Sequence, residues 1–210
     1  MNVYTFFATH RAEILSTTLE HLELVLLAMV IAVAIAIPLG IFIVERRAWR
    51  TVALGIASVF QTIPSLALFG FLIPIPFIGG IGKRTAVVAL VLYALLPILR
   101  NTYVGLTGID PAVLEAATAM GMTPWQVMWR VRLPLALSVI LAGIRTATVI
   151  TIGVATIAAA IGAGGLGTFI FRGVAMVSDA VILAGAIPAA LLALLADGLL
   201  AMLERRLRVS

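Results

Sequence analysis

Long runs of apolar residues, separated by short groups of charged residues, set the pattern of this chain. The first run, residues 24–44, contains no charged side chain. As a helix it would be about 30 Å long, which matches the hydrocarbon core of a bilayer. Similar runs follow it, and we predict about five membrane-spanning helices, over residues 24–44, 52–72, 85–100, 134–161 and 179–203.

The segment before the first run, residues 1–23, is polar to amphipathic. Leucines recur at helical spacing across its end, at Leu15, Leu19, Leu22 and Leu26, with glutamates among them. This pattern predicts a lead-in helix at the membrane surface that continues into the first span.

Composition narrows the class of protein further. Of the 210 residues, 63% are hydrophobic and 11% are charged, whereas soluble domains are roughly half apolar and a quarter charged. Membrane β-barrels show short alternating segments instead of continuous runs. We therefore expect an all-α integral membrane protein with one domain over residues 1–210. The chain has no cysteine, and its two histidines are too few for a metal site, so we expect none.

Positively charged residues are distributed unequally between the two sides of five such spans. One side holds Arg46, Arg47, Arg50, Arg100, Arg130, Arg132, Arg205, Arg206 and Arg208, and the other holds Arg11, Lys83, Arg84 and Arg172. The positive-inside rule places the richer side in the cytoplasm, with residues 110–134 and the C-terminus, and the N-terminus outside. Because these residues flank apolar runs, the net charge of +5 does not indicate a nucleic-acid partner.

The longest stretch without a membrane pattern is residues 110–134. Asp110 followed by a proline predicts a helix start, and Gly121 predicts its left-handed stop. Thr123 and Gln126 form a capping box for a second short helix, which ends or kinks at Pro134. We expect a cytoplasmic helical hairpin whose small residues, Ala116 and Ala117, leave a surface that a partner can approach closely.

The same stretch carries a motif. Glu-Ala-Ala at residues 115–117, Gly121 and Val-Arg-Leu-Pro at residues 131–134 resemble the EAA loop of ATP-binding-cassette (ABC) importer permeases, with valine where the family pattern has isoleucine. The resemblance implies that this loop docks into a groove of a separate ATPase subunit. The coupling residues would be Glu115, Ala116, Ala117, Gly121, Leu133 and Pro134.

Further stretches resemble the branch of these permeases that imports glycine betaine, carnitine or choline: residues 38–41, 61–68, 93–103, 143–148 and 161–167. This resemblance implies the type I ABC-importer permease fold and alternating access. It also implies a separate extracytoplasmic solute-binding protein and a second permease, either an identical copy or a paralogue. ATP and magnesium would belong to the partner ATPase, and we expect no cofactor in this chain.

Polar residues inside the predicted spans are candidates for the translocation pathway. Gln61, Thr62, Pro64 and Ser65 interrupt the second span, and Tyr93 lies on the third. Such groups need hydrogen-bond partners from protein or water. Either this face of the helix lines a cavity, or the residues mark a simple helix kink in which Gln61 bonds to a neighbouring group.

An arginine within the predicted fourth span, Arg145, also has two possible roles. Arg145 falls about 16 Å into its helix. A charge at that depth is functional or paired. Arg145 therefore either meets a substrate carboxylate in the pathway, or holds helices together through a buried ion pair with Asp197 or through contacts to carbonyl groups.

Two glycine-rich stretches resemble nucleotide-binding motifs, but the residues around them exclude that function. Residues 162–167 match the dinucleotide fingerprint, but no strand–helix–strand unit surrounds them. Residues 79–83 lack the first glycine of a phosphate loop, and Arg84 stands where serine or threonine is required. With no catalytic set of serine, histidine and aspartate, we expect a non-enzymatic subunit. The alternatives are an ABC permease for another small solute, such as an amino acid or another betaine, and a stand-alone secondary transporter.

Overall fold

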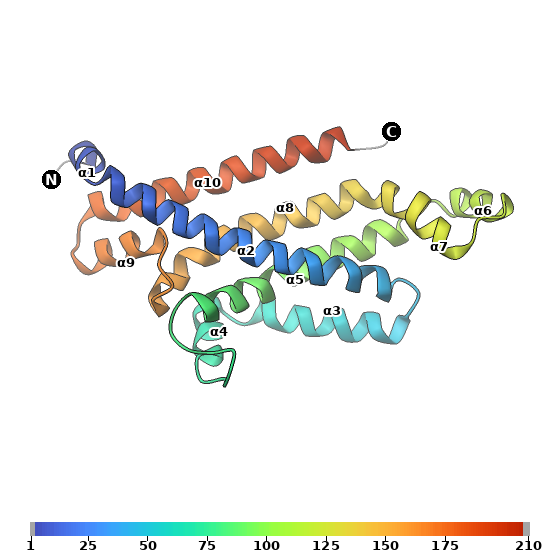
Figure 1. The fold of residues 1–210 in the computed structure, drawn as a ribbon, viewed down its shortest axis with the longest axis horizontal. Coiled ribbons are helices and arrows are strands. Elements are labelled where there is room, and N and C mark those ends of the chain that lie inside the picture. Colours follow the sequence, from blue (N-terminus) through green and yellow to red (C-terminus); the bar gives the residue numbers. More distant parts are fainter. Residues whose placement is uncertain (1–2, 208–210) are drawn as a thin grey trace.

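The computed structural model describes residues 3–207 and, over that range, is a bundle of helices without a strand. Figure 1 shows an elongated molecule in which α1 and α9 lie at the end that holds the N-terminus. The short helices α6 and α7 project from the opposite end, on the side where the chain finishes. The helices are α1 (Val3–Thr9), α2 (Arg11–Ile43), α3 (Arg47–Thr62), α4 (Ser65–Leu72), α5 (Lys83–Thr107), α6 (Pro111–Ala119), α7 (Pro124–Val127), α8 (Leu133–Ala158), α9 (Gly167–Ala175) and α10 (Asp179–Arg206).

Helix α5 lies at the centre and packs against α2, α3 and α8, while α10 packs against α8 and α9. Small residues allow these close approaches. A Cβ atom at Gly143 of α8 would lie 2.6 Å from the Cβ of Asn101 on α5. A Cβ at Gly40 of α2 would lie 2.5 Å from a methyl group of Thr102. Close backbone packing of this kind replaces the hydrophobic effect as the source of helix association inside a membrane.

Four helical segments are long and apolar enough to cross a bilayer: α2, α5, α10, and residues 124–161, which contain α7 and α8. The predicted second span differs from the expectation. Residues 48–62 and 65–72 meet at an angle of 105°, so this segment is a fifth span only if the bent pair counts as one. Pro64 supplies the break because proline disfavours helical geometry in the residue before it, and Ile63 is extended, with ψ 128°.

The start of the chain also differs from the expected single lead-in helix. Helix α1 ends at Thr9, and α2 begins at Arg11 and runs without interruption into the membrane pattern. His10 lies between them, where its ring stacks on Phe6 with centroids 4.1 Å apart. Residues 1–2 of the predicted lead-in, and Arg208 of the predicted basic group, lie outside the described residues.

Pro134 neither ends the preceding helix nor stands alone as a kink. Residues Met128–Arg132 form a π-helical turn that joins α7 to α8, and the N–H of Leu133 bonds to the carbonyl of Met128. Proline has no N–H to give to a carbonyl one turn earlier, and a wider turn accommodates that loss without breaking the rod. As a result, the loop between α5 and α8 continues directly into a membrane-spanning helix.

Candidate functional site

The loop between α5 and α8 has the local geometry that its sequence predicts. The carboxylate of Asp110 accepts a hydrogen bond of 2.9 Å from the N–H of Ala112. The N–H of Thr123 donates to the side-chain oxygen of Gln126 at 2.8 Å, and the threonine hydroxyl accepts from the N–H of Gln126 at 3.4 Å. Gly121 adopts φ +81°, a conformation that favours glycine. These caps hold α6 and α7 as two short, preformed helices.

The predicted coupling residues do not share one environment. Glu115, Ala116 and Gly121 are exposed, but the side chain of Ala117 is buried against its own chain at 2% exposure. The expectation that Ala117 forms part of a bare outer surface is therefore wrong. Its small side chain fits inside the loop, close to the turn that leads back to α7. In that turn the carbonyl of Ala117 accepts a hydrogen bond from the N–H of Met122. Leu133 and Pro134 lie at the start of α8, half-buried and exposed respectively.

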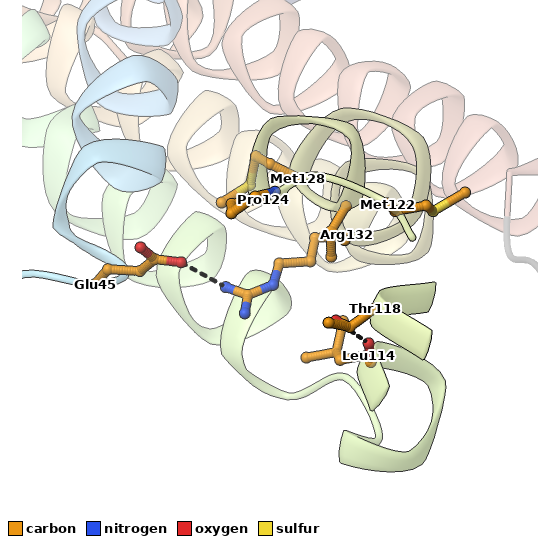
Figure 2. Close-up of a pocket in the computed structure, with 8 residues that line it drawn as sticks. Glu45, Leu114, Thr118, Met122, Pro124, Met128 and Arg132 are labelled. Atoms are coloured by element: carbon orange, nitrogen blue, oxygen red, sulfur yellow. Dashed lines mark hydrogen bonds and ion pairs between the residues drawn. The ribbon is translucent and has the colours of Figure 1, made fainter. Parts of the chain in front are cut away.

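A pocket of about 240 Å³ lies between this loop and the end of α2 (Figure 2). Glu45, just after α2, faces Arg132 of the π-helical turn across it, with carboxylate and guanidinium atoms 3.8 Å apart. The Nε atom of Arg132 is buried and has no hydrogen-bond partner within the described chain. This ion pair links the loop to the end of the first membrane helix, a contact that sequence spacing did not reveal.

The polar patch predicted in the second span lies at the bend between α3 and α4. Gln61 and Ser65 are half-buried, and Thr62 and Pro64 are exposed. The structure brings buried Tyr93 of α5 to the same place, where its hydroxyl donates a hydrogen bond to the carbonyl of Ile63. Tyr93 therefore satisfies a backbone group freed by the bend. Whether the patch also lines a pathway stays a prediction.

Arg145 and Asp197 form the ion pair that the sequence offered as one of two interpretations, but the pair is only partly buried, with side chains that are 34% and 39% exposed. The Nε and Nη2 atoms of the guanidinium donate to the two carboxylate oxygens at 2.6 and 2.7 Å. This bidentate geometry is the strong form of the interaction and joins α8 to α10. Sequence analysis missed Glu204, which lies 3.5 Å from the Nη1 atom of Arg145. Its spacing of two helical turns from Asp197 is the signal that could have identified it.

The glycine-rich break between α8 and α9 also has a definite role. Gly162, Gly164 and Gly165 all have positive φ, and the N–H of Gly165 donates to the carboxylate of Glu20 at 3.2 Å. No strand flanks this break within residues 3–207, which agrees with the rejection of a dinucleotide site. On α9, exposed Arg172 forms an ion pair of 2.9 Å with Glu13. The break therefore packs against α2.

Together, the membrane-length helices, the paired charges between α8 and α10 and the preformed loop at one end define a multi-pass membrane transport subunit. The family described as binding-protein-dependent transport system inner membrane component matches residues 23–209. The chain belongs to this family and is a permease subunit of an ABC importer.

Several permeases are similar to this chain over nearly its whole length. The choline transport system permease protein OpuBB of Bacillus subtilis is 43% identical over 98% of this chain and 94% of its own length. The carnitine transport permease protein OpuCD of Listeria monocytogenes is 47% identical over 96% of this chain and 90% of its own length. The osmoprotectant import permease protein OsmW of Salmonella typhimurium is 45% identical over 97% of this chain and 96% of its own length.

Solved structures support the same fold. An inward-facing form of the MetNI methionine ABC transporter aligns with a TM-score of 0.82 at 25% identity, over 92% of this chain and 95% of the other. An amino acid ABC transporter solved with histidines aligns with a TM-score of 0.79 at 21% identity and shows the fold alone. The predicted type I importer permease fold is therefore confirmed, with the bent α3–α4 pair in place of one straight span.

Proposed function

We propose that this chain forms the translocation pathway of an importer for small quaternary-ammonium osmoprotectants such as glycine betaine, carnitine and choline. The observation that carries the proposal is end-to-end similarity to permeases named for choline, carnitine and osmoprotectants. An extracytoplasmic binding protein selects the solute and delivers it to the permease. The membrane helices then open alternately to the two sides.

The partner ATPase docks on the hairpin of α6 and α7. Glu115, Ala116 and Gly121 support this assignment because they are exposed at one end of the bundle, on helices whose caps are already formed. Ala117, Leu133 and Pro134 act indirectly, the first by keeping the loop compact and the others by joining it to α8. ATP and magnesium bind to the partner, so this chain supplies a mechanical contact and holds no cofactor.

The loop and the C-terminus face the cytoplasm, and the N-terminus faces outward. Two observations support this orientation. The loop lies at the opposite end of the bundle from α1 (Figure 1), and the arginine-rich segments share its end. The exposed rings of Trp125 and Trp129, 5.3 Å apart on neighbouring turns, suit the level of the lipid headgroups.

A second permease, identical or paralogous, completes the pathway. The support is a set of helical glycines, Gly55, Gly153 and Gly198, at which an added Cβ would meet no atom of the described chain within 4 Å. Glycine on an open face of a membrane helix is typical of surfaces where another helix packs closely. Co-purification of two differently tagged copies tests whether the pair is a homodimer.

Reconstituted transport tests the function. The permease, its ATPase and its binding protein in proteoliposomes should accumulate labelled glycine betaine, carnitine or choline only when ATP is supplied to the ATPase. Methionine and histidine serve as competing solutes, because the structural neighbours are transporters of amino acids. Uptake of an amino acid alone would favour the other-solute alternative. Uptake by the lone permease under an ion gradient would contradict the proposal.

A further inference from the structure

A second polar cavity, of about 370 Å³, lies between α8 and α10. Its charged lining consists of Arg145, Asp197 and Glu204, and Thr146 adds a hydroxyl group. At about 30 Å³ for each water of liquid, the space exceeds that of several water molecules, so a small solute fits. This cavity is separate from the pocket beneath the coupling loop and shares no lining residue with it.

The cavity has an excess of negative charge. Asp197 occupies the Nε and Nη2 edge of Arg145 with two short hydrogen bonds. Glu204 meets only the remaining Nη1 atom, at 3.5 Å, and therefore keeps most of its capacity to accept further interactions. One guanidinium faces two carboxylates, which leaves a formal charge of −1. Arg205 and Arg206 are exposed neighbours in the sequence but do not line the space.

The position of the cavity makes that charge significant. Asp197 lies nine residues before the end of α10, or about 14 Å along the helix axis, whereas Glu204 lies two residues before that end. The cavity therefore extends from the end of α10 to the depth of Asp197, and both walls belong to membrane-length segments. Charged groups at such a depth face a protein interior or a water-filled space, because lipid does not stabilise them. The open side of the cavity therefore faces water or protein, as a translocation pathway does.

We propose that this cavity binds the cationic quaternary-ammonium group of the solute, with Glu204 as the group that recognises it. The proposal rests on the function proposed above and names a solute site within the permease itself. A quaternary ammonium has no N–H to donate, so a nearby carboxylate holds it by charge rather than by a hydrogen bond. Arg145 is already engaged by Asp197, and its role is to position the acidic wall instead of meeting a solute carboxylate.

A thiol-protection experiment tests this site directly. The chain has no cysteine, so Thr146→Cys places a single thiol in the cavity wall. In the full transporter complex, choline should slow the reaction of this thiol with a neutral maleimide. The neutral isostere of choline, in which carbon replaces nitrogen, should give at most one-third of that protection. Equal protection by both compounds, or none by choline, would overturn the proposal.

Two variants in the Thr146→Cys background identify the recognising group. Glu204→Gln should raise the choline concentration for half-protection about tenfold or more. Glu23→Gln, which removes an exposed carboxylate at the other end of the bundle, should leave it unchanged. An unchanged value in Glu204→Gln would assign the protection to another group. If the Thr146→Cys complex imports choline but shows no protection, only this inference fails, whereas absence of ATP-driven uptake counts against the proposed function.

Discussion

The carboxylate of Glu20 on α2 reaches across to accept a hydrogen bond from the backbone N–H of Gly165, 3.2 Å away in the break after α8. A Cβ atom at Gly164 would lie only 2.7 Å from the same carboxylate, and one at Gly165 would lie 3.2 Å from the Nδ1 atom of buried His21. The glycines are therefore required by close approach as well as by positive φ. Contacts of Glu13 with Arg172 and of Glu23 with Lys83 extend this attachment along α2.

Gly164→Ala should lower the thermal stability of the purified permease. Its φ of +82° costs a residue with a Cβ about 1–2 kcal/mol, and the methyl group would also displace Glu20. The measurement is the unfolding temperature in detergent. Gly70→Ala on α4 is the matched control, because that position is helical and no described atom lies within 4 Å of the added methyl. Equal melting temperatures for the two variants would refute the close-approach argument.

Tyr93→Phe should destabilise the bend between α3 and α4. The change leaves the carbonyl of Ile63, in a partly buried setting, without the hydroxyl that now donates to it. An unsatisfied buried acceptor costs about 1–3 kcal/mol. Thermal unfolding of the purified protein measures the effect. Tyr4→Phe, at a side chain that is 84% exposed, should have no effect. A melting temperature equal to wild type would show that the hydroxyl makes no net contribution at the bend.

The local sequence rules predicted the helix ends of the loop between α5 and α8 because these depend on neighbouring residues. The cap at Asp110, the capping box of Thr123 and Gln126, and the stop at Gly121 each need information from within four residues. The same holds for the long apolar helices, whose length and composition alone specify them. A membrane solvent simplifies the problem further, since each backbone group must be satisfied within its helix.

Prediction was poorer wherever distant segments meet. The burial of Ala117 depends on how α7 folds back over α6, and the carbonyl of Ile63 at the 105° bend accepts its hydrogen bond from Tyr93, 30 positions away. The pairing of Glu45 with Arg132 joins residues 87 positions apart. The Arg145–Asp197 pair was predictable in spite of its separation because unpaired charges are scarce in membrane helices. Glu204 was missed, since it lies near a helix end, where charge is ordinary, and only its spacing of two helical turns from Asp197 points to it.

Removing one member of the Arg145–Asp197 pair should be worse than removing both. Arg145→Gln leaves Asp197 and Glu204 facing each other without a cation, so we expect a lower melting temperature and reduced uptake. The Arg145→Gln, Asp197→Asn double variant should recover much of the stability, because two neutral amides can bond to each other. Unfolding temperatures of the four members of this double-mutant cycle provide the measurement. Independent, additive losses would show that the contact does not couple α8 to α10.

Gly121→Val should separate ATP hydrolysis from transport while leaving membrane insertion intact. No atom of the described chain lies within 4 Å of an added Cβ, so the change creates no internal clash there. The cost comes from φ +81°, which a β-branched residue adopts only with strain of about 1–2 kcal/mol, so the angle between α6 and α7 shifts. In proteoliposomes we expect uptake to fall several-fold and ATPase stimulation by the loaded binding protein to be lost.

The control for this prediction is Gly121→Asn, since asparagine tolerates the left-handed region and should keep most of the transport. Membrane fractionation establishes that both variants insert equally. If valine supported full uptake, the geometry of the bend would be irrelevant to coupling. If asparagine failed as completely as valine, the lack of a side chain, rather than the backbone conformation, would be what the docking surface requires at this exposed position.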